Sequence, residues 1–407
     1  MLAQDDIPLS PVFHPELRAA GKPLLALLFC ALAVCGGCRR GQRDYAGDLF
    51  AYVSNGKSDT LSVIDLADFK VVRTIGVGHS PTGVSVNPRR DEVYAVNTES
   101  NNISIIDARK NVVAGTVGVH RAPYFMDVSA DGRRGYVANS GSDNVSVLDL
   151  DRRAVIATVH VGGAPGVARV SPDGKRVVVS NRRDNTVSIL DAGALQVRAT
   201  LPVCVHPEDI SILPDSSKAF VACSGSAQVA AIDLRSNKVL ALLDVGRTPI
   251  NLALKPDGGE LFVSNFDSDS VSVIETTANE VGGSYLIGSK PVRAMVSPDN
   301  GLLYVSNFGS DSVSVFSIDS SRVITSIPVG RRPDALALTP AQDFLLAADS
   351  ESGDVAVVRL TKLPRGNKIG AAEAFVKGPN PNKERALFTI IPVGVQPRAL
   401  AVKAVSR

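Results

Sequence analysis

The sequence predicts an all-β protein: an eight-bladed β-propeller built from four-stranded antiparallel blades. Three observations lead to this prediction: a repeat of 42 residues, four strand-like segments in each repeat, and a C-terminal segment that completes the first repeat. The 34 glycines and 24 prolines among 407 residues agree with many short strands and turns. The formal net charge of +2 gives no specific signal of nucleic-acid binding.

A tetrapeptide marks the 42-residue repeat. The segment "YVSN" at 52–55 recurs in related forms, and its last residue recurs as Asn55, Asn97, Asn139, Asn181, Cys223, Asn265, Asn307 and Asp349. A proline keeps the same period, at Pro81, Pro123, Pro165, Pro207, Pro249, Pro291 and Pro333. Each repeat is one supersecondary unit, so eight tetrads predict eight blades.

Four strands can be read within each repeat. In residues 291–330 the segments "VRAMVS", "LLYVSN", "SVSVFSI" and "RVITSIPVG" show the alternation and the β-branched residues that are typical of strands. The turn residues "PDNG" separate the first segment from the second. We expect the asparagine that closes the second strand to cap its own turn, which is a structural role.

The two ends of the chain are expected to build one blade together. Residues 397–405, "PRALAVKAV", match the first strand of a repeat, whereas residues 48–79 supply only the second to fourth strands. Their pairing closes the ring without leaving an edge. Pro397 follows Pro333 by 64 residues rather than 42, so the last repeat carries a 22-residue insertion, placed within 361–387 between its third and fourth strands.

The repeats resemble those of the YVTN-family β-propellers, including YncE-like periplasmic proteins, over about residues 48–360 and 388–405. The second-strand tetrad carries the resemblance, together with the third-strand segments "SDSVSVIE" and "DNVSVLDL". The resemblance implies an exported protein and says almost nothing about chemistry. WD40 propellers are a poorer match, because the chain has no tryptophan.

The N-terminal segment has the layout of a secretory signal. An apolar run of 11 residues, 24–34, follows Arg18 and Lys22 and precedes the small-residue cluster "CGGC". The run is too short to span a bilayer as an ordinary helix. Similarity to bacterial lipoprotein signals makes Cys38 the candidate for lipidation and Cys35 the alternative, although the segment could also remain as a membrane anchor.

These features divide the chain into a signal peptide at 1–38, a linker at 39–47 and a propeller at 48–407. We therefore expect an exported monomer of the periplasm or cell surface, held by a lipid anchor to a bacterial membrane. Haem attachment at "CGGCR" is not expected, since Arg39 stands where a c-type haem needs histidine.

A ring of basic residues is predicted around one end of the propeller channel. The first strand of each blade lines the channel, so the two residues before each repeat proline should surround its mouth. The pairs are His79-Ser80, Arg121-Ala122, Gly163-Ala164, Val205-His206, Arg247-Thr248, Ser289-Lys290, Arg331-Arg332 and Val395-Gln396. Five of these 16 residues are Lys or Arg, two are His and none is acidic, which predicts a positive mouth.

A positive mouth predicts the binding of an anion such as a carboxylate, a phosphate or an acidic glycan. The candidate ligand-binding residues are His79, Arg121, His206, Arg247, Lys290, Arg293, Arg331 and Arg332. The alternative is a solvated rim without a ligand, and three acids just inside the ring, Glu208, Asp209 and Asp334, could neutralise it.

Two pairs of residues are candidates for ties between blades. Asp127 and Arg169 stand at equivalent first-strand positions of adjacent blades, where we expect an ion pair; the alternative is a polar channel patch in which Arg169 and Arg293 hold an anion. Cys204 and Cys223 should lie on the mouth side of adjacent blades, where an exported protein could join them in a disulfide.

No catalytic constellation, cofactor or metal site is predicted. There is no G-x-S-x-G elbow, and the histidines of the ring belong to different blades. The sequence thus predicts an envelope binding module for a small anionic ligand or an envelope protein. The alternative is a periplasmic enzyme or cofactor-handling propeller, lactonase-like or of the d1-haem type, that uses the central channel.

Overall fold

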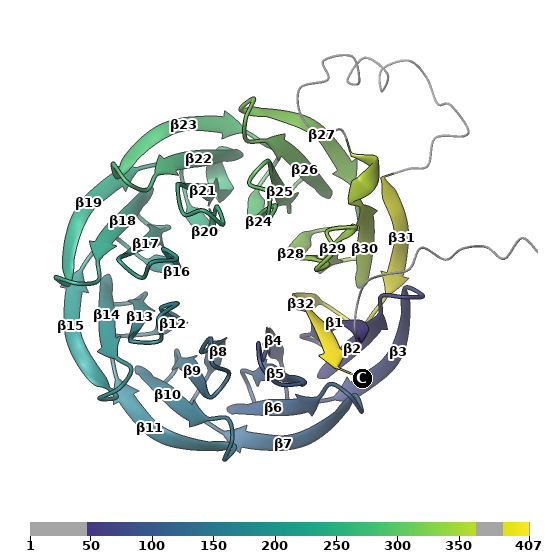
Figure 1. Ribbon diagram of the computed structural model, residues 1–407, viewed down its shortest axis with the longest axis horizontal. Helices are drawn as coiled ribbons and strands as arrows, with labels where there is room; N and C mark the ends of the chain where they lie inside the picture. The colour runs from purple at the N-terminus through teal and green to yellow at the C-terminus, as the bar shows by residue number, and fades with distance from the viewer. Residues whose placement is uncertain (1–46, 364–385, 407) are drawn as a thin grey trace, which may run out of the picture. The chain divides into compact units, whose positions relative to one another are not determined.

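The computed structural model describes residues 47–363 and 386–406. The chain divides into two units, Met1–Asp44 and Tyr45–Arg407, and the fold described below is that of the second. The predicted signal peptide and the lipidation candidates Cys38 and Cys35 lie outside the described residues. Eight four-stranded antiparallel sheets surround a central channel, which confirms the predicted fold class (Figure 1).

Blade 1 consists of β32, β1, β2 and β3, and blades 2 to 8 follow in chain order from β4–β7 to β28–β31. The innermost strands are β32 (Pro397–Ser406), β4 (Pro81–Val86), β8 (Pro123–Val128), β12 (Pro165–Val170), β16 (Pro207–Ile212), β20 (Pro249–Leu254), β24 (Pro291–Val296) and β28 (Pro333–Leu338). The second strands are β1 (Gly47–Asn55), β5 (Glu92–Asn97), β9 (Arg134–Asn139), β13 (Arg176–Asn181), β17 (Lys218–Cys223), β21 (Glu260–Asn265), β25 (Leu302–Asn307) and β29 (Phe344–Asp349).

The third strands are β2 (Thr60–Asp65), β6 (Asn102–Asp107), β10 (Asn144–Asp149), β14 (Thr186–Asp191), β18 (Gln228–Asp233), β22 (Ser270–Glu275), β26 (Ser312–Ser317) and β30 (Asp354–Arg359). The outermost strands are β3 (Lys70–Gly76), β7 (Val112–Gly118), β11 (Ala154–His160), β15 (Gln196–Pro202), β19 (Lys238–Asp244), β23 (Glu280–Leu286), β27 (Arg322–Pro328) and β31 (Leu387–Pro392). Two 3-10 turns, η1 (Phe266–Ser268) and η2 (Leu360–Lys362), complete the described elements.

The hydrophobic core lies between neighbouring blades. Tyr136 and Val147 of blade 3, for example, join Val179 and Leu190 of blade 4 in one buried cluster. Both faces of the third strand β10 are covered, whereas the outermost strand β11 alternates exposed residues with partly or fully buried ones, because one blade face meets water there. Each large aliphatic or aromatic side chain buried in this way contributes roughly 1.5–3 kcal/mol to folding, so a blade depends on its neighbours for its stability.

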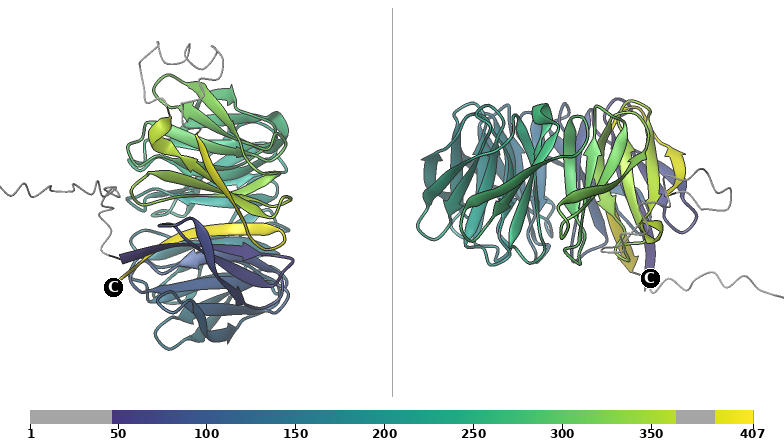
Figure 2. Two further views of the ribbon diagram at one scale, coloured as in Figure 1. Left: turned by 90° about the vertical axis from the view of Figure 1, so that its right-hand side faces the viewer. Right: turned by 90° about the horizontal axis from the view of Figure 1, so that it is seen from above.

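The two ends of the chain close the ring as predicted. Strand β32 pairs antiparallel with β1 in a register that runs from Gly47 opposite Ser406 to Ser54 opposite Ala399. Both views in Figure 2 show the C-terminal strand beside the N-terminal one. Because β32 is the innermost strand of blade 1, the chain ends meet in one sheet and the ring has no open edge there.

The asparagine of the repeat tetrad has a structural role, but its partners differ from those expected. The Asn55 side chain is fully buried, and its Nδ2 donates to Thr60 Oγ1 and Ser62 Oγ on the third strand, both at 3.0 Å. Five further blades repeat this pattern, from Asn97 to Asn307. The asparagine therefore ties the second strand to the third rather than capping its own turn.

The last repeat is interrupted between its third and fourth strands. Strand β30 ends at Arg359 and β31 begins at Leu387. Most of the predicted insertion 361–387 lies outside the described residues. Among the residues that the structure describes, no helix is long and apolar enough to cross a membrane.

Candidate functional site

The backbone of the blade junctions fixes a ring of residues at the channel mouth. The residue before each repeat proline has a positive φ of 49–57° in all eight junctions: Ser80, Ala122, Ala164, His206, Thr248, Lys290, Arg332 and Gln396. In six junctions the backbone N–H of this residue donates to an Asp or Asn side chain at 2.7–2.9 Å. Those acceptors lie in the turn between the second and third strands, so this turn shares the mouth with the junctions.

The mouth is consequently not the acid-free ring expected from the junctions alone. The carboxylate of Asp59 lies 2.7 Å from His79 Nδ1, and that of Glu351 lies 3.0 Å from Arg332 Nε. Their mutual hydrogen bond lowers the pKa of Asp59 and raises that of His79. The expectation failed because both acids come from the turns between second and third strands, which the junction sequences do not include.

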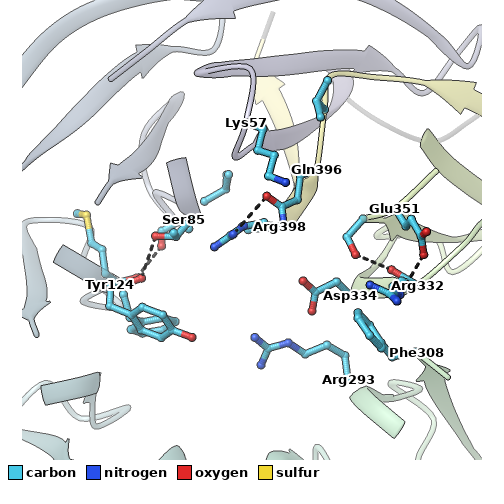
Figure 3. Close-up of a pocket in the computed structure, with 18 residues that line it drawn as sticks. Lys57, Ser85, Tyr124, Arg293, Phe308, Arg332, Asp334, Glu351, Gln396 and Arg398 are labelled. Atoms are coloured by element: carbon cyan, nitrogen blue, oxygen red, sulfur yellow. Dashed lines mark hydrogen bonds and ion pairs between the residues drawn. The ribbon is translucent and has the colours of Figure 1, made fainter. Parts of the chain in front are cut away.

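A cavity of about 560 Å³ opens at one side of the mouth, between blades 7, 8, 1, 2 and 3 (Figure 3). Its charged and aromatic lining residues are Lys57, Arg293, Arg332, Arg398, Asp334, Glu351, Tyr124, Phe125 and Phe308. Of the predicted ligand-binding residues, Arg293 and Arg332 line this cavity. The other six do not: His79, Arg121, His206, Arg247, Lys290 and Arg331.

A β-bulge places three of the lining residues. On β8, β28 and β32 the strand register shifts directly after the proline, so that Tyr124, Asp334 and Arg398 have no partner on the second strand. A bulge turns the extra side chain away from the regular pleat. In Figure 3, Asp334 and Arg398 extend from adjacent blades into the mouth and Tyr124 faces them from blade 3.

Three charged groups of the cavity lie near one another without pairing directly. Burial raises the pKa of Asp334 above its usual range, and the nearby guanidinium groups of Arg293 and Arg398 offset this rise only in part. Among the described residues, no carboxylate lies within 4.0 Å of the guanidinium of Arg293 or of Arg398. The only side-chain hydrogen bond of Arg398 in the described part goes to Gln396 Oε1, at 3.3 Å. Two exposed arginines thus remain open to an anion.

Two aromatic rings of the cavity, those of Tyr124 and Phe308, make cation–π contacts with arginine side chains. The guanidinium of Arg182 lies 4.3 Å from the ring centre of Tyr124, and that of Arg332 lies 5.3 Å from the ring centre of Phe308. Cation–π contacts of this kind hold an aromatic ring in place. Tyr124 and Phe308 thus contribute aromatic surface to the cavity that Arg293 and Arg398 also line.

Farther along the channel, polar side chains link the innermost strands of five consecutive blades. Arg169 lies 3.8 Å from Asp127 and 3.5 Å from Asp209, as the expected ion pair required. Asp209 in turn accepts from Asn251 Nδ2 at 2.8 Å, and Asn251 Oδ1 accepts from the backbone N–H of Ala294 at 2.8 Å. The second alternative, Arg169 and Arg293 holding one anion, is not supported, because Arg169 already has two carboxylate partners.

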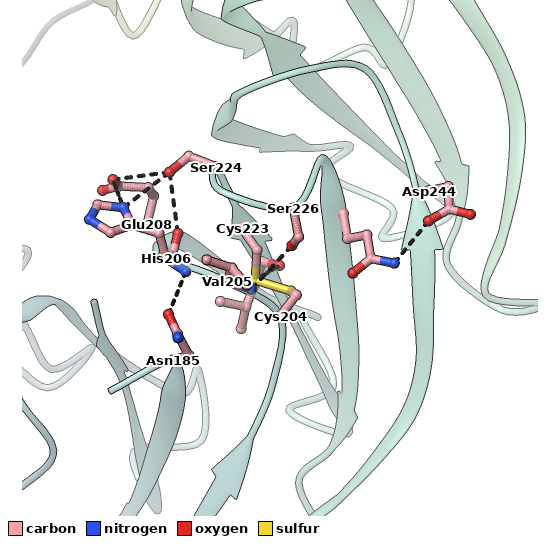
Figure 4. Close-up of a disulfide and its surroundings, with 11 residues drawn as sticks. Asn185, Cys204, Val205, His206, Glu208, Cys223, Ser224, Ser226 and Asp244 are labelled. Carbon is pink, nitrogen blue, oxygen red and sulfur yellow. Dashed lines mark hydrogen bonds and ion pairs between the residues drawn. A yellow bond between two sulfur atoms is a disulfide. The ribbon is translucent and has the colours of Figure 1, made fainter. Parts of the chain in front are cut away.

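His206 belongs to a separate cluster in blade 5, shown in Figure 4. Its Nδ1 lies 2.9 Å from Glu208 and 3.1 Å from Ser224 Oγ, while Glu208 also pairs with Arg182 at 2.8 Å. A catalytic triad needs the acid and the hydroxyl on opposite ring nitrogens. Here both lie at Nδ1, so the cluster is a hydrogen-bonded pair at the rim and not a nucleophile-activating triad.

Beside this cluster, a disulfide joins Cys204 to Cys223 (Figure 4). Their Cα atoms are 5.6 Å apart, and both residues are buried. The bridge fixes the junction that carries His206 to the end of β17. In the described part of the chain, no group of three or more His, Cys, Asp or Glu side chains is arranged to hold a metal ion.

Sequence reasoning missed Lys57, Tyr124, Phe308 and Arg398. A signal for them exists in the repeat alignment. Tyr124 and Arg398 directly follow the repeat proline, and Phe308 directly follows the tetrad asparagine. Both positions vary in chemistry from blade to blade, whereas the proline or asparagine directly before them recurs in most blades. Such variation is expected of positions that face the mouth rather than the core.

Comparison with family models finds two partial matches. Residues 289–382 match the model of the lactonase, 7-bladed β-propeller, and residues 90–211 match that of the cytochrome D1 haem domain. No curated protein matches the sequence.

Solved structures share the fold at low sequence identity. Hydrazine synthase of Kuenenia stuttgartiensis aligns with a TM-score of 0.56 at 23% identity, over 69% of this chain and 95% of that one. Dihydro-haem d1 dehydrogenase NirN, solved in complex with DHE, gives 0.70 at 14% identity, over 86% and 74%. A functionally unknown protein from Desulfotomaculum acetoxidans gives 0.56 at 15% identity, over 75% and 100%. The chain is therefore an eight-bladed β-propeller protein, similar in separate segments to the lactonase propellers and to the cytochrome d1 haem domain.

Proposed function

We propose that the protein is a binding module whose channel mouth takes a carboxylate-bearing ligand between Arg293 and Arg398. The observation that carries the proposal is the pair of exposed guanidinium groups in one concave cavity, neither within 4.0 Å of a carboxylate of the described residues. A guanidinium binds carboxylates through two parallel charge-assisted hydrogen bonds. Two arginines without a carboxylate within 4.0 Å among the described residues, in a cavity of ligand size, support such a role.

The charge balance of the cavity supports the same assignment. Four basic and two acidic side chains line it, and one of the acids, Glu351, is already paired with Arg332. The excess positive charge lies in a walled mouth, where the field is stronger than on open surface. Apolar faces of Tyr124 and Phe308 offer contact to the uncharged part of a ligand.

Calorimetric titration with glutarate and citrate tests this proposal. We expect the variant R293S/R398S to bind at least about tenfold more weakly than the parent protein, because charge-assisted hydrogen bonds are lost. The matched control is R247S/R331S, which removes the same charge from rim residues outside the cavity and should bind nearly as well as the parent. Equal weakening in both variants would assign the effect to bulk charge and contradict the proposal.

We further propose that the protein is exported and anchored through Cys38. The support is the N-terminal sequence alone: the apolar run, the preceding basic residues and the cysteine after small residues. Metabolic labelling with a fatty acid should label the parent protein and not C38S. Label retained in C38S and lost in C35S would move the anchor to Cys35.

A cofactor-handling or enzymatic role is the second candidate, suggested by the segment similar to the cytochrome d1 haem domain and by NirN, whose structure was solved with DHE. The cavity does not fit a haem held by histidine, because none of its described lining residues is a histidine or a cysteine. His206 lies in blade 5, opposite blade 1 in the ring of eight. An absorbance spectrum of the purified protein decides the matter: a Soret-type band that persists in R293S/R398S would favour the cofactor role.

A further inference from the structure

We infer that the ligand of the mouth is a small zwitterion of the amino-acid type, whose ammonium group pairs with Asp334 while Arg293 and Arg398 hold its carboxylate. This inference rests on the proposed function and adds a second recognition element to it. It concerns the chemical class of the ligand and the residue that selects it.

The first argument is the position of Asp334. It is the bulge residue of β28, it lines the same cavity as the two arginines, and in Figure 3 its carboxylate lies between Arg293 and Arg398. No hydrogen bond or ion pair of its side chain occurs within the described residues. A partly buried carboxylate without hydrogen bonds is costly, so a partner supplied by a ligand would stabilise it.

The second argument comes from the other acids of the mouth. The carboxylate of Glu351 lies 3.0 Å from Arg332 Nε, and that of Glu208 lies 2.8 Å from Arg182 Nη2. A carboxylate whose only task is to neutralise an arginine makes this kind of direct contact. Asp334 is near enough to Arg293 and Arg398 for each to lower its pKa, yet it stays beyond 4.0 Å from both. The gap leaves room for a group that contacts the acid and the bases together.

The third argument is chemical complementarity. A simple dicarboxylate would meet the two arginines but would be repelled by Asp334. A zwitterion satisfies all three groups at once, because its ammonium donates to the acid and its carboxylate accepts from the guanidinium groups. Tyr124 and Phe308 line the same cavity and offer aromatic contact to the uncharged part of the ligand.

Two pairs of probes that differ only in the amine test the inference: L-glutamate against glutarate, and L-phenylalanine against 3-phenylpropanoate. By calorimetry, the parent protein should bind the amino member of at least one pair about tenfold more tightly than its deaminated counterpart, the effect of one charge-assisted pair. D334N should lose this preference and bind the deaminated acid more tightly than the parent does. The control E351Q, which removes a paired acid of the same cavity, should keep the preference.

The outcomes separate the inference from the proposed function. Equal affinity of the parent for both members of each pair overturns the zwitterion and leaves the carboxylate site standing. A preference that survives in D334N also overturns it, since the ammonium would then be recognised elsewhere. If no probe and no carboxylate binds the parent, the proposed function itself fails. D334E serves as a second variant: it keeps the charge and should retain part of the preference, which separates loss of recognition from loss of folding.

Discussion

The disulfide partners Cys204 and Cys223 of blade 5 stand at two positions that are a glycine and an asparagine in five other blades. In those blades the glycine lies directly against the asparagine side chain. At Gly288, for example, an added Cβ would lie 2.4 Å from the Asn307 side chain. In these five blades the glycine leaves space for the asparagine side chain, whereas blade 3 has His120 at the glycine position beside Asn139. Blade 5 has exchanged both together, and it also has Ala230 where those five blades have the serine that accepts from the asparagine. A covalent tie has replaced a hydrogen-bonded one.

The first prediction concerns this replacement. C204A/C223A should lower the free energy of unfolding by about 3 kcal/mol, the amount expected for a cross-link of this loop length. The triple variant C204G/C223N/A230S restores the tie of the other blades and should recover part of the loss. Denaturant unfolding without reductant measures both. A triple variant no more stable than C204A/C223A would show that the two ties are not equivalent.

The second prediction concerns Asp349, which stands at the asparagine position of blade 8. Burial and the neighbouring Asp354 raise its pKa to about 9, so in the folded protein it keeps a proton and can donate as asparagine does. The unfolded chain releases that proton near pH 4, and the stability of the parent should therefore fall as the pH rises from about 4 to about 9.

D349N removes this proton uptake. Its stability advantage over the parent should grow across that pH window, with a slope of up to about 1.4 kcal/mol per pH unit, and should level off above it. The mirror control is N307D in blade 7, which should be destabilised with the same pH dependence. Parallel pH profiles of D349N and the parent would show that Asp349 is ionised in the folded state.

The third prediction concerns Arg169, which belongs to the polar side chains that link the innermost strands of neighbouring blades. R169M leaves the carboxylates of Asp127 and Asp209 without their shared partner, at a cost of about 1–3 kcal/mol for a partly exposed group. Burial already raises the pKa of Asp127, and the loss of Arg169 raises it further. The deficit should thus grow as the pH rises above about 4, where an unfolded aspartate ionises. A deficit that is constant from pH 4 to pH 8 would indicate lost packing instead of lost charge pairing.

The fourth prediction concerns ring closure. A chain that ends at Gln396 lacks β32, so β1 keeps an open edge and the interface between blades 8 and 1 loses its innermost strand. We expect a lower unfolding midpoint and self-association, measured by circular dichroism and light scattering. A control that lacks only residues 406–407 should behave like the parent. A monomeric truncated protein of unchanged stability would mean that the shared blade is dispensable.

Much of the fold is predictable from the sequence because all blades share one sequence pattern, so a feature found in one repeat can be checked in the others. The period of the tetrads and prolines gives the number of blades, and the match of residues 397–405 to a first strand gives the closure. Likewise, the pairing of Asp127 with Arg169 follows from comparing equivalent positions of adjacent repeats, and that of Cys204 with Cys223 follows from the mouth-side location of the two strand ends that carry them.

The site could be predicted only in part, because it depends on distances across the ring. Arg293 and Arg332 were identifiable as basic residues near the mouth, whereas Arg398 and Tyr124 reach the cavity through β-bulges that the alternation of strand residues does not reveal. The pairing of Arg332 with Glu351 was not foreseeable from the junctions, since the acid comes from a different turn of blade 8.

A crystal structure of the protein with glutarate is the most direct test of the account. We predict a carboxylate of the ligand between Arg293 and Arg398, with oxygen atoms about 3 Å from nitrogen atoms of both guanidinium groups. A saturated crystal that shows this position empty, with the ligand at the rim beside Arg247 and Arg331, would contradict the central claim.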